Sequence, residues 1–506
     1  MVMNDDAALL IERLIKRDQL LWQGNDNPPL GWLDSIGFIQ EHACNLMQWA
    51  KSLMVERQIE QIVLIGMGGA SLATEVFYSV FGRQNGFPEI TILDTTSPAV
   101  LHQLKISDQT LFIVASKSGN TIETMCLYAW LFERAKSLKG HPNKKFIAIT
   151  DADTDLGKIA STENFLHVFV NPNDIVGRFS ALSYFSLVPA ALMGIDLVRL
   201  GKQLNRAWSN CLTGKSSELV NMIQAMNACS ASGYGILGVD IQFPLYPLFG
   251  WIEQLVAEST GKQGKGILLV HSKQIDRKIL TSDKYQSIRI TMQDEYDLGG
   301  IFMQWMAAVS IAASYLNINA FDQPDVEASK KQTLRLVEDS LQKSSDEKHY
   351  DFKNITIQFG TQPITILKNK IEKFCKQTGK ESYLAILAYL PRERSIEKSL
   401  EKLADSFMSV FDIVTIGFGP RYLHSTGQYH KGGPQIGSFL EIIEENELEI
   451  PIPGREYGFV RLHQAQADGD LLILEKKQRP VLRFMIQGER LEELDRLTQL
   501  LTSMAK

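Results

Sequence analysis

Cysteine is scarce in this sequence, and the few cysteines that occur are far apart. Five are present among 506 residues, and no two of them form a Cys-x-x-Cys pair. Disulfide-held secreted scaffolds and thiolate zinc sites both need cysteines in closer or more regular spacing. The sequence therefore argues against both classes of protein and fits a reducing cytoplasm.

A surplus of positive charge is also lacking. Lys and Arg number 52 against 58 for Asp and Glu, which leaves a net charge of −6. A protein devoted to nucleic acid needs a basic surplus to neutralise phosphates, so no nucleic-acid partner is expected. Hydrophobic residues make up 44% and charged residues 22%, which is ordinary globular composition, and ~150 residues per domain suggests about three domains.

One stretch lacks formal charge and is long enough to cross a bilayer, residues 298–321. It contains Gln304, Ser310 and Asn317 and begins with a glycine pair. We therefore expect a buried core helix and not a membrane span. The N-terminus opens acidic and amphipathic, unlike a signal peptide, so we expect no membrane partner.

Short apolar runs rich in Ile, Val and Phe alternate with helical stretches after a helical segment at residues 1–55. The first series comprises residues 61–66, 89–94, 111–116, 145–150 and 167–171. The second series comprises residues 266–271, 287–292, 383–390, 411–419 and 438–443. Continuous apolar runs are typical of strands buried on both faces of a parallel sheet.

This strand–helix alternation predicts an α/β protein with two doubly wound, mostly parallel sheets, each covered by helices on both faces. We place one sheet in residues 56–200. The other lies in residues 201–506, together with inserted helices at about 298–316 and 324–344 and a C-terminal extension.

Two loops that follow predicted strands are rich in small and hydroxyl residues, and ligands bind at such strand ends in open α/β sheets. In the first loop Gly66, Gly68 and Gly69 lead into a helix whose free amides suit an anion. Ser71 stands where a dinucleotide fingerprint has its third glycine. A nicotinamide or flavin enzyme, with Asp94 as the ribose-binding acid, remains an alternative.

The second loop, SKSGNTIET, places Ser116, Lys117, Ser118 and Thr121 just before a helix. Hydroxyls, amides and one cation suit the tetrahedral phosphate of a phosphomonoester. Two anion-binding turns on neighbouring strands fit a sugar phosphate better than an extended dinucleotide. The alternative is a helix capped by Ser118 or Thr121, which leaves Lys117 without an explanation.

The motifs GMGGASL, SKSGNTIET and VGRFSALS, in this order, resemble a sugar isomerase (SIS) domain and, more specifically, the glucose-6-phosphate isomerase family. Further similar blocks lie at residues 251–262, 318–330 and 418–434. The chain is similar to the isomerase half of bacterial transaldolase–glucose-6-phosphate isomerase fusions. The resemblance implies SIS-type sheets and a cofactor-independent conversion of glucose 6-phosphate to fructose 6-phosphate through a cis-enediolate. It also implies a homodimer.

The resemblance assigns roles to particular residues. Glu258 matches the base that moves a proton between carbon 2 and carbon 1, whereas Glu253, five residues earlier, points elsewhere. Arg178 matches the arginine over the enediolate, and Lys330 would contact substrate and assist ring opening. The predicted substrate-binding residues are Gly68, Gly69, Ser71, Ser116, Lys117, Ser118, Thr121 and Gln323.

A histidine opens the sugar ring in the family, and the order of the sequence blocks is rearranged here. The candidates are His430, His424 and His271, of which we select His430, beside glycines in GQYHKGGP. Val176 stands where the family has glycine, which predicts an altered loop because valine cannot adopt a positive φ cheaply. Ala70 replaces a serine, with the loss of a contact worth ~1 kcal/mol unless Ser71 or water replaces it.

Two other functions of the same fold stay open. An isomerase could also accept mannose 6-phosphate, which depends on the pocket shape around carbon 2. A non-catalytic sugar-phosphate sensor would have no need of a base such as Glu258. No metal-ligand spacing of histidines and carboxylates is visible, so neither metal nor cofactor is expected.

Overall fold

The structure is a computed structural model. It describes residues 2–22, 27–231, 234–271, 274–275, 279–281, 284–327, 332–336, 355–358, 364–377, 382–445 and 448–504.

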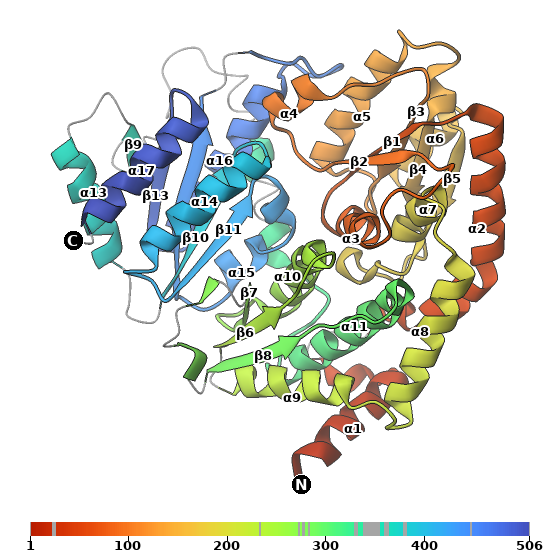
Figure 1. Cartoon of the computed structure of the whole chain (residues 1–506), viewed down its shortest axis with the longest axis horizontal. Helices are drawn as coiled ribbons and strands as arrows, with labels where there is room; N and C mark the ends of the chain where they lie inside the picture. The colour runs from red at the N-terminus through yellow and green to blue at the C-terminus, as the bar shows by residue number, and fades with distance from the viewer. Residues whose placement is uncertain are drawn as a thin grey trace.

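The first lobe is built around a parallel sheet of five strands in the order β2-β1-β3-β4-β5 (Figure 1). These strands are β1 (Gln61–Gly66), β2 (Glu89–Leu93), β3 (Thr110–Ala115), β4 (Phe146–Thr150) and β5 (His167–Val170). Its helices are α1 (Val2–Ile15), α2 (Ser35–Arg57), α3 (Leu72–Phe81), α4 (Pro98–Gln103), α5 (Ile122–Ala135), α6 (Asp155–Thr162), α7 (Tyr184–Leu192), α8 (Leu197–Leu212), α9 (Glu218–Ser230), α10 (Tyr246–Thr260) and α11 (Leu298–Tyr315).

The second lobe holds another parallel sheet of five strands, in the order β11-β10-β12-β13-β9. Its strands are β9 (Thr356–Gln358), β10 (Tyr383–Tyr389), β11 (Ile413–Phe418), β12 (Gly437–Glu444) and β13 (Val481–Ile486). Its helices are α13 (Ile364–Lys376), α14 (Arg394–Phe407), α15 (Gly427–Gly432), α16 (Phe459–Lys476) and α17 (Arg490–Met504).

The two large sheets share one architecture. The order β2-β1-β3-β4 of the first sheet matches β11-β10-β12-β13 of the second. The fifth strand differs between the two sheets. In the first sheet β5 follows the other four strands in the sequence, whereas in the second sheet β9 precedes them. The predicted fold class, α/β with two mostly parallel sheets, is confirmed.

A third, smaller parallel sheet that the sequence did not predict lies between the two lobes. It has the order β7-β6-β8, and its strands are β6 (Tyr234–Asp240), β7 (Gly266–His271) and β8 (Tyr285–Arg289). Alternate side chains of β7 point to opposite cores, because successive residues of a strand face opposite sides of its sheet. Leu269 packs in the core of the first lobe and Leu268 in that of the second. We count this sheet with the first lobe.

The runs at 266–271 and 287–292 were expected in the second large sheet, and the structure places them in this smaller one instead. The domain boundaries predicted at residues 55 and 200 stay a prediction. Helices α8–α11, which follow the second boundary or span it, share a hydrophobic core with α2, α3 and α7. The helix expected at 324–344 is described only at 324–327 and 332–336, where it is helical.

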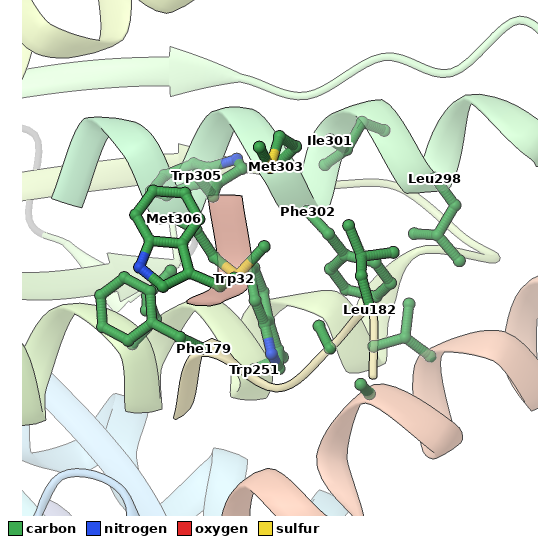
Figure 2. Close-up of a cluster of buried hydrophobic side chains, with 14 of the residues drawn as sticks. Trp32, Phe179, Leu182, Trp251, Leu298, Ile301, Phe302, Met303, Trp305 and Met306 are labelled. Carbon is green, nitrogen blue, oxygen red and sulfur yellow. The ribbon is translucent and has the colours of Figure 1, made fainter. Parts of the chain in front are cut away.

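The uncharged stretch forms α11, as predicted, and lies in the core of the first lobe. One helix in the described part of the chain, Glu295–Tyr315, is long and apolar enough to cross a membrane. Of its most apolar 18-residue stretch, 83% is buried inside the protein. Figure 2 shows α11 packed through Phe302 and Met306 among Trp251, Phe179 and Trp32. Phe179 follows Arg178 directly, so this core fixes the backbone that presents Arg178.

We predict that Phe302→Ala lowers the free energy of unfolding by about 3–5 kcal/mol, because it leaves a cavity in a close-packed core. The Phe302 ring is fully buried and its centroid lies 4.7 Å from that of Trp251 in an edge-to-face arrangement. Denaturant unfolding measures the change. Val55→Ala, at a side chain 76% exposed, is the control, and equal effects of the two substitutions would contradict this packing.

Candidate active site

A cavity of about 200 Å³ opens at the carboxyl ends of β1 and β3. β1 pairs with β2 on one side and with β3 on the other, which is the topological switch point where open α/β sheets bind ligands. Most of the predicted site residues line it: Gly68, Gly69, Ser116, Lys117, Ser118, Thr121, Arg178, Glu258 and Gln323.

The loop after β3 presents hydroxyl groups next to the start of α5. Thr121 is the N-cap residue of α5, but its side chain makes no capping hydrogen bond. Its Oγ1 lies 3.0 Å from Oγ of Ser116 instead. Both hydroxyls and the free amides of the first turn are therefore placed to bind an anion. Lys117 forms an ion pair with Asp151, so an incoming phosphate must share that ammonium group.

The glycines after β1 leave room for neighbouring segments. Gly68 has φ +57, and a Cβ built there would lie 3.0 Å from the carbonyl oxygen of His424 and 2.7 Å from Nε2 of Gln254. A Cβ on Gly69 would lie 2.0 Å from the carbonyl oxygen of Gly177. The sequence predicted that these glycines admit a ligand. The structure adds that they admit His424, Gln254 and the loop that carries Arg178.

Ser71 does not line the cavity. Its side chain is buried and its Oγ donates to the carbonyl oxygen of Gly68 at 3.2 Å, so it stabilises the glycine-rich turn. Val176 has φ −71 and ψ 152. This is extended backbone that valine adopts without strain, so Val176 does not force the altered loop that its φ argument predicted.

Arg178 is buried beside the cavity, and its guanidinium group binds two other segments of the chain, the end of α10 and the segment after α11. Its Nη1 donates to Glu258 at 3.2 Å and to Oε1 of Gln323 at 2.7 Å. Its Nε donates to Ser259 at 2.9 Å, and its Nη2 donates to the carbonyl oxygen of Ala320 at 2.6 Å. Burial lowers the pKa of Arg178, and the nearby Glu258 carboxylate opposes that shift.

Glu258 lies near the end of α10, where its carboxylate faces Arg178, and the residue is 4% exposed. Oε1 accepts a hydrogen bond from Nε2 of Gln254, one turn earlier on α10, at 3.2 Å. Glu253 does not line the cavity, and burial raises its pKa to about 8. The prediction that Glu253 points elsewhere thus agrees with its position.

A second buried cation lies behind Arg178. Lys262 donates from Nζ to the carbonyl oxygen of Asn319 at 2.7 Å and to a carboxylate oxygen of Asp322 at 2.7 Å. Burial, together with the charge of Arg178, lowers the pKa of Lys262 to about 8. The segment after α11 is therefore fixed by Arg178 from one side and by Lys262 from the other.

His424 comes from the second lobe and closes the cavity. Its Nε2 lies 2.9 Å from Oε1 of Glu123, which is on α5 of the first lobe. Gln466, on α16 of the second lobe, donates to the same carboxylate oxygen at 2.8 Å. Sequence reasoning named His424 only as an alternative and missed Glu123 and Gln254, although Glu123 lies within the quoted SKSGNTIET motif.

The selected histidine, His430, lies outside the cavity. It is buried in the second lobe beside Phe439, with ring centroids 5.0 Å apart, and beside Tyr383 and Tyr422. Burial, with Lys431 nearby, holds the pKa of His430 well below its usual value. Its position does not support contact with a substrate.

Three further predictions have different outcomes. His271 ends β7 at the small sheet and does not line the cavity. Asp94, considered as a ribose-binding acid, is ion-paired with Arg421. Lys330 lies outside the described residues. Within the described part of the chain, no group of three or more His, Cys, Asp or Glu side chains is gathered as metal ligands would be.

Comparison with known proteins finds a match to the region that contributes most of the residues lining this cavity. The phosphoglucose isomerase family matches residues 45–265. Gly68, Lys117, Arg178 and Glu258 lie inside the matched region, whereas Gln323 and His424 lie beyond it.

Similar proteins carry related names. The chain is 25% identical over 399 residues to the probable glucose-6-phosphate isomerase of Methanococcus maripaludis, covering 65% of this chain and 87% of the relative. It is 26% identical to glucose-6-phosphate isomerase of Prochlorococcus marinus, covering 58% of this chain and 68% of the relative. It is 31% identical to the Campylobacter jejuni enzyme of the same name, with 40% and 51% covered.

A solved structure is similar in fold. The glucose-6-phosphate isomerase of Chlamydia trachomatis aligns with a TM-score of 0.54 and 16% sequence identity, covering 67% of this chain and 86% of that chain. At this identity the likeness concerns the fold alone.

Gly68→Ala tests the contact that the two lobes make at the glycine-rich turn after β1. The positive φ alone costs about 1–2 kcal/mol, and forcing His424 and Gln254 away adds about 1–3 kcal/mol. Gly86→Ala is the matched control, because Gly86 has φ +81 and a Cβ there meets nothing within 4 Å. Denaturant unfolding should show the larger loss for Gly68→Ala. Equal losses would mean that the lobes do not meet at Gly68.

Proposed function

We propose that this chain interconverts glucose 6-phosphate and fructose 6-phosphate by proton transfer through a cis-enediolate. The observation that carries the proposal is the buried carboxylate of Glu258 between a fixed guanidinium group and a hydroxyl-rich anion loop, in one cavity. An aldose–ketose isomerase needs these three groups together: a base, a stabiliser of developing oxygen charge, and an anchor that orients the substrate.

The anchor holds the phosphate. Ser116, Ser118 and Thr121, with Lys117 and the first amides of α5, supply donors at one end of the cavity. Gln323 accepts from Arg178 through its carbonyl oxygen, which leaves its amide N–H groups to the substrate. The same residues would hold either sugar phosphate, because carbon 6 and its phosphate do not change.

The proton transfer follows from the position of Glu258. In the open-chain aldose, the carboxylate removes the proton on carbon 2. The electron pair of that bond forms the double bond between carbons 1 and 2, and negative charge moves to the oxygen on carbon 1. A proton then passes from the hydroxyl oxygen on carbon 2 to the oxygen on carbon 1. The carboxyl group returns its proton to carbon 1, and the charge left on the oxygen of carbon 2 forms the ketone there. The buried guanidinium group of Arg178 stabilises the enediolate oxygens at low dielectric.

His424 is the ring-opening residue in this proposal, in place of His430. His424 lines the cavity, and the Glu123 carboxylate, 2.9 Å from Nε2, orients its imidazole ring. The family resemblance assigned Lys330 to substrate contact. This role stays a proposal, because Lys330 lies outside the described residues. We also keep as proposals a homodimer and a cytoplasmic location, the latter supported by five cysteines that are all free thiols.

We expect Glu258→Gln to lower kcat by at least 10²-fold, since loss of a general base typically costs 10²–10⁴ in rate. A coupled assay in both directions measures the change. Glu253→Gln is the control on the same helix: with its pKa at about 8, Glu253 is mostly neutral at pH 7, so the amide replaces it with little change in kcat.

The same assay separates the competing functions. Wild-type protein that binds the sugar phosphate without turnover would be a sensor. Wild-type protein that also converts mannose 6-phosphate would be a dual isomerase. A Glu258→Gln variant within a few-fold of wild type would overturn the role of Glu258 as the base.

His424→Gln and His430→Gln distinguish the two histidines. The first should lower kcat by 10²-fold or more, because proton transfer to and from the ring oxygen is lost. The second should lower the unfolding midpoint but leave kcat within about three-fold, because His430 packs among aromatic rings away from the cavity. The reverse pattern would return the ring-opening role to His430.

A further inference from the structure

The turn that carries His424 contacts the first lobe at both ends, through His424 with Glu123 and Gly68 and through one arginine. This turn is a single 3-10 helix, η10 (Arg421–His424), which follows β11 in the second lobe. Arg421 forms ion pairs with Glu75 on α3 and with Asp94 at the end of β2. Both carboxylates belong to the first lobe, so the Arg421 guanidinium group links the two lobes.

The electrostatics of this contact are strong because the groups are mostly buried. Burial opposes ionisation of Glu75, but Arg421 and Arg392 outweigh it and lower the pKa of Glu75 to about 2. The two carboxylates also raise the pKa of Arg421, against the effect of burial. Helix α10 passes close by, since a Cβ on Gly250 would lie 3.8 Å from Nη2 of Arg421.

Only one short turn separates Arg421 from His424. Backbone hydrogen bonds from Leu423 to Pro420 at 3.0 Å and from Ser425 to Tyr422 at 3.0 Å hold its shape. The His424 end packs on the backbone of Gly68 and reaches Glu123, while the Arg421 end lies in the carboxylate pair. A displacement of Arg421 is therefore transmitted to the imidazole.

We infer that Arg421 is a positioning residue for His424: its ion pairs with Glu75 and Asp94 fix the turn so that the imidazole stays in the cavity. This inference rests on the proposed isomerase function and assigns Arg421 no contact with substrate. The other side of the turn is attached to the second lobe, where the Tyr422 hydroxyl donates to Asp470 at 2.8 Å. Without Arg421, the contacts of His424 itself would have to hold the turn against the first lobe.

Arg392 provides the matched control. It also belongs to the second lobe and donates to Glu75 at 2.7 Å. Its side chain is 43% exposed, and it lies far along the chain from the His424 turn. A general tie between the lobes would make Arg392 and Arg421 equivalent, whereas positioning of His424 requires Arg421 alone.

The experiment compares Arg421→Gln, Arg421→Lys and Arg392→Gln in the coupled isomerase assay. We expect Arg421→Gln to lower kcat at least ten-fold with KM within three-fold, because the phosphate anchor lies in the first lobe. Arg421→Lys should recover part of the loss, since an ammonium group can still pair with one carboxylate. Arg392→Gln should stay within two-fold of wild type.

A double variant separates positioning from general stability. In the His424→Gln background, Arg421→Gln should lower kcat by less than a further two-fold, because the group it positions is already gone. If the two losses multiply instead, Arg421 acts through the fold as a whole and the inference fails. It also fails if Arg421→Gln keeps kcat within three-fold of wild type.

A stability measurement and a substitute variant distinguish misfolding from loss of positioning. Thermal unfolding of each variant identifies a misfolded protein, and if Arg421→Gln does not fold, Asp94→Asn replaces it because it removes one partner while keeping the side-chain shape. Asp94→Asn should then lower kcat with KM unchanged, and a wild-type kcat would contradict the inference. Wild-type protein without isomerase activity would overturn the proposed function itself, a result distinct from unaffected Arg421 variants.

Discussion

The guanidinium group of Arg178 is the interaction on which the site depends. A buried arginine is costly to remove from water, by several kcal/mol, unless its donors are satisfied. Here Ser259, Glu258 and Gln323 accept from it, as do backbone carbonyl oxygens after α11. One cation therefore fixes α10, the loop after β5 and the segment after α11 relative to each other, and the cavity lies between them.

The second constraint is the meeting of the lobes. The first lobe supplies the anion loop, the buried carboxylate and the arginine, while the second supplies His424. Gly68 makes the contact close, since a side chain at this position would collide with the His424 backbone. In the proposed reaction, ring opening depends on how the lobes dock, whereas the proposed phosphate anchor belongs to the first lobe.

Local sequence could predict that the loops after β1 and β3 line the cavity, because glycines, hydroxyls and a lysine between a buried strand and a helix are typical of an anion-binding loop. It could not reveal β6, where Gly235 and Gly238 interrupt the apolar run to admit Cys229 and Tyr285, nor β13, where buried Arg483 is paired with Glu441. The position of His424 at the cavity, with His430 outside it, could not be predicted for another reason. Docking of two lobes decides which imidazole reaches the cavity, and no local pattern encodes it.

The central claim, that hydrogen moves between carbons 1 and 2 as a proton held by a carboxylate, can be tested directly by solvent exchange. Wild-type protein is incubated with glucose 6-phosphate in D₂O, and the sugar phosphates are followed by proton NMR over many turnovers. A carboxyl proton exchanges with water during the lifetime of the enediolate, so deuterium should accumulate on carbon 1 of fructose 6-phosphate and carbon 2 of glucose 6-phosphate. Isomerisation with no deuterium in either sugar would contradict the account.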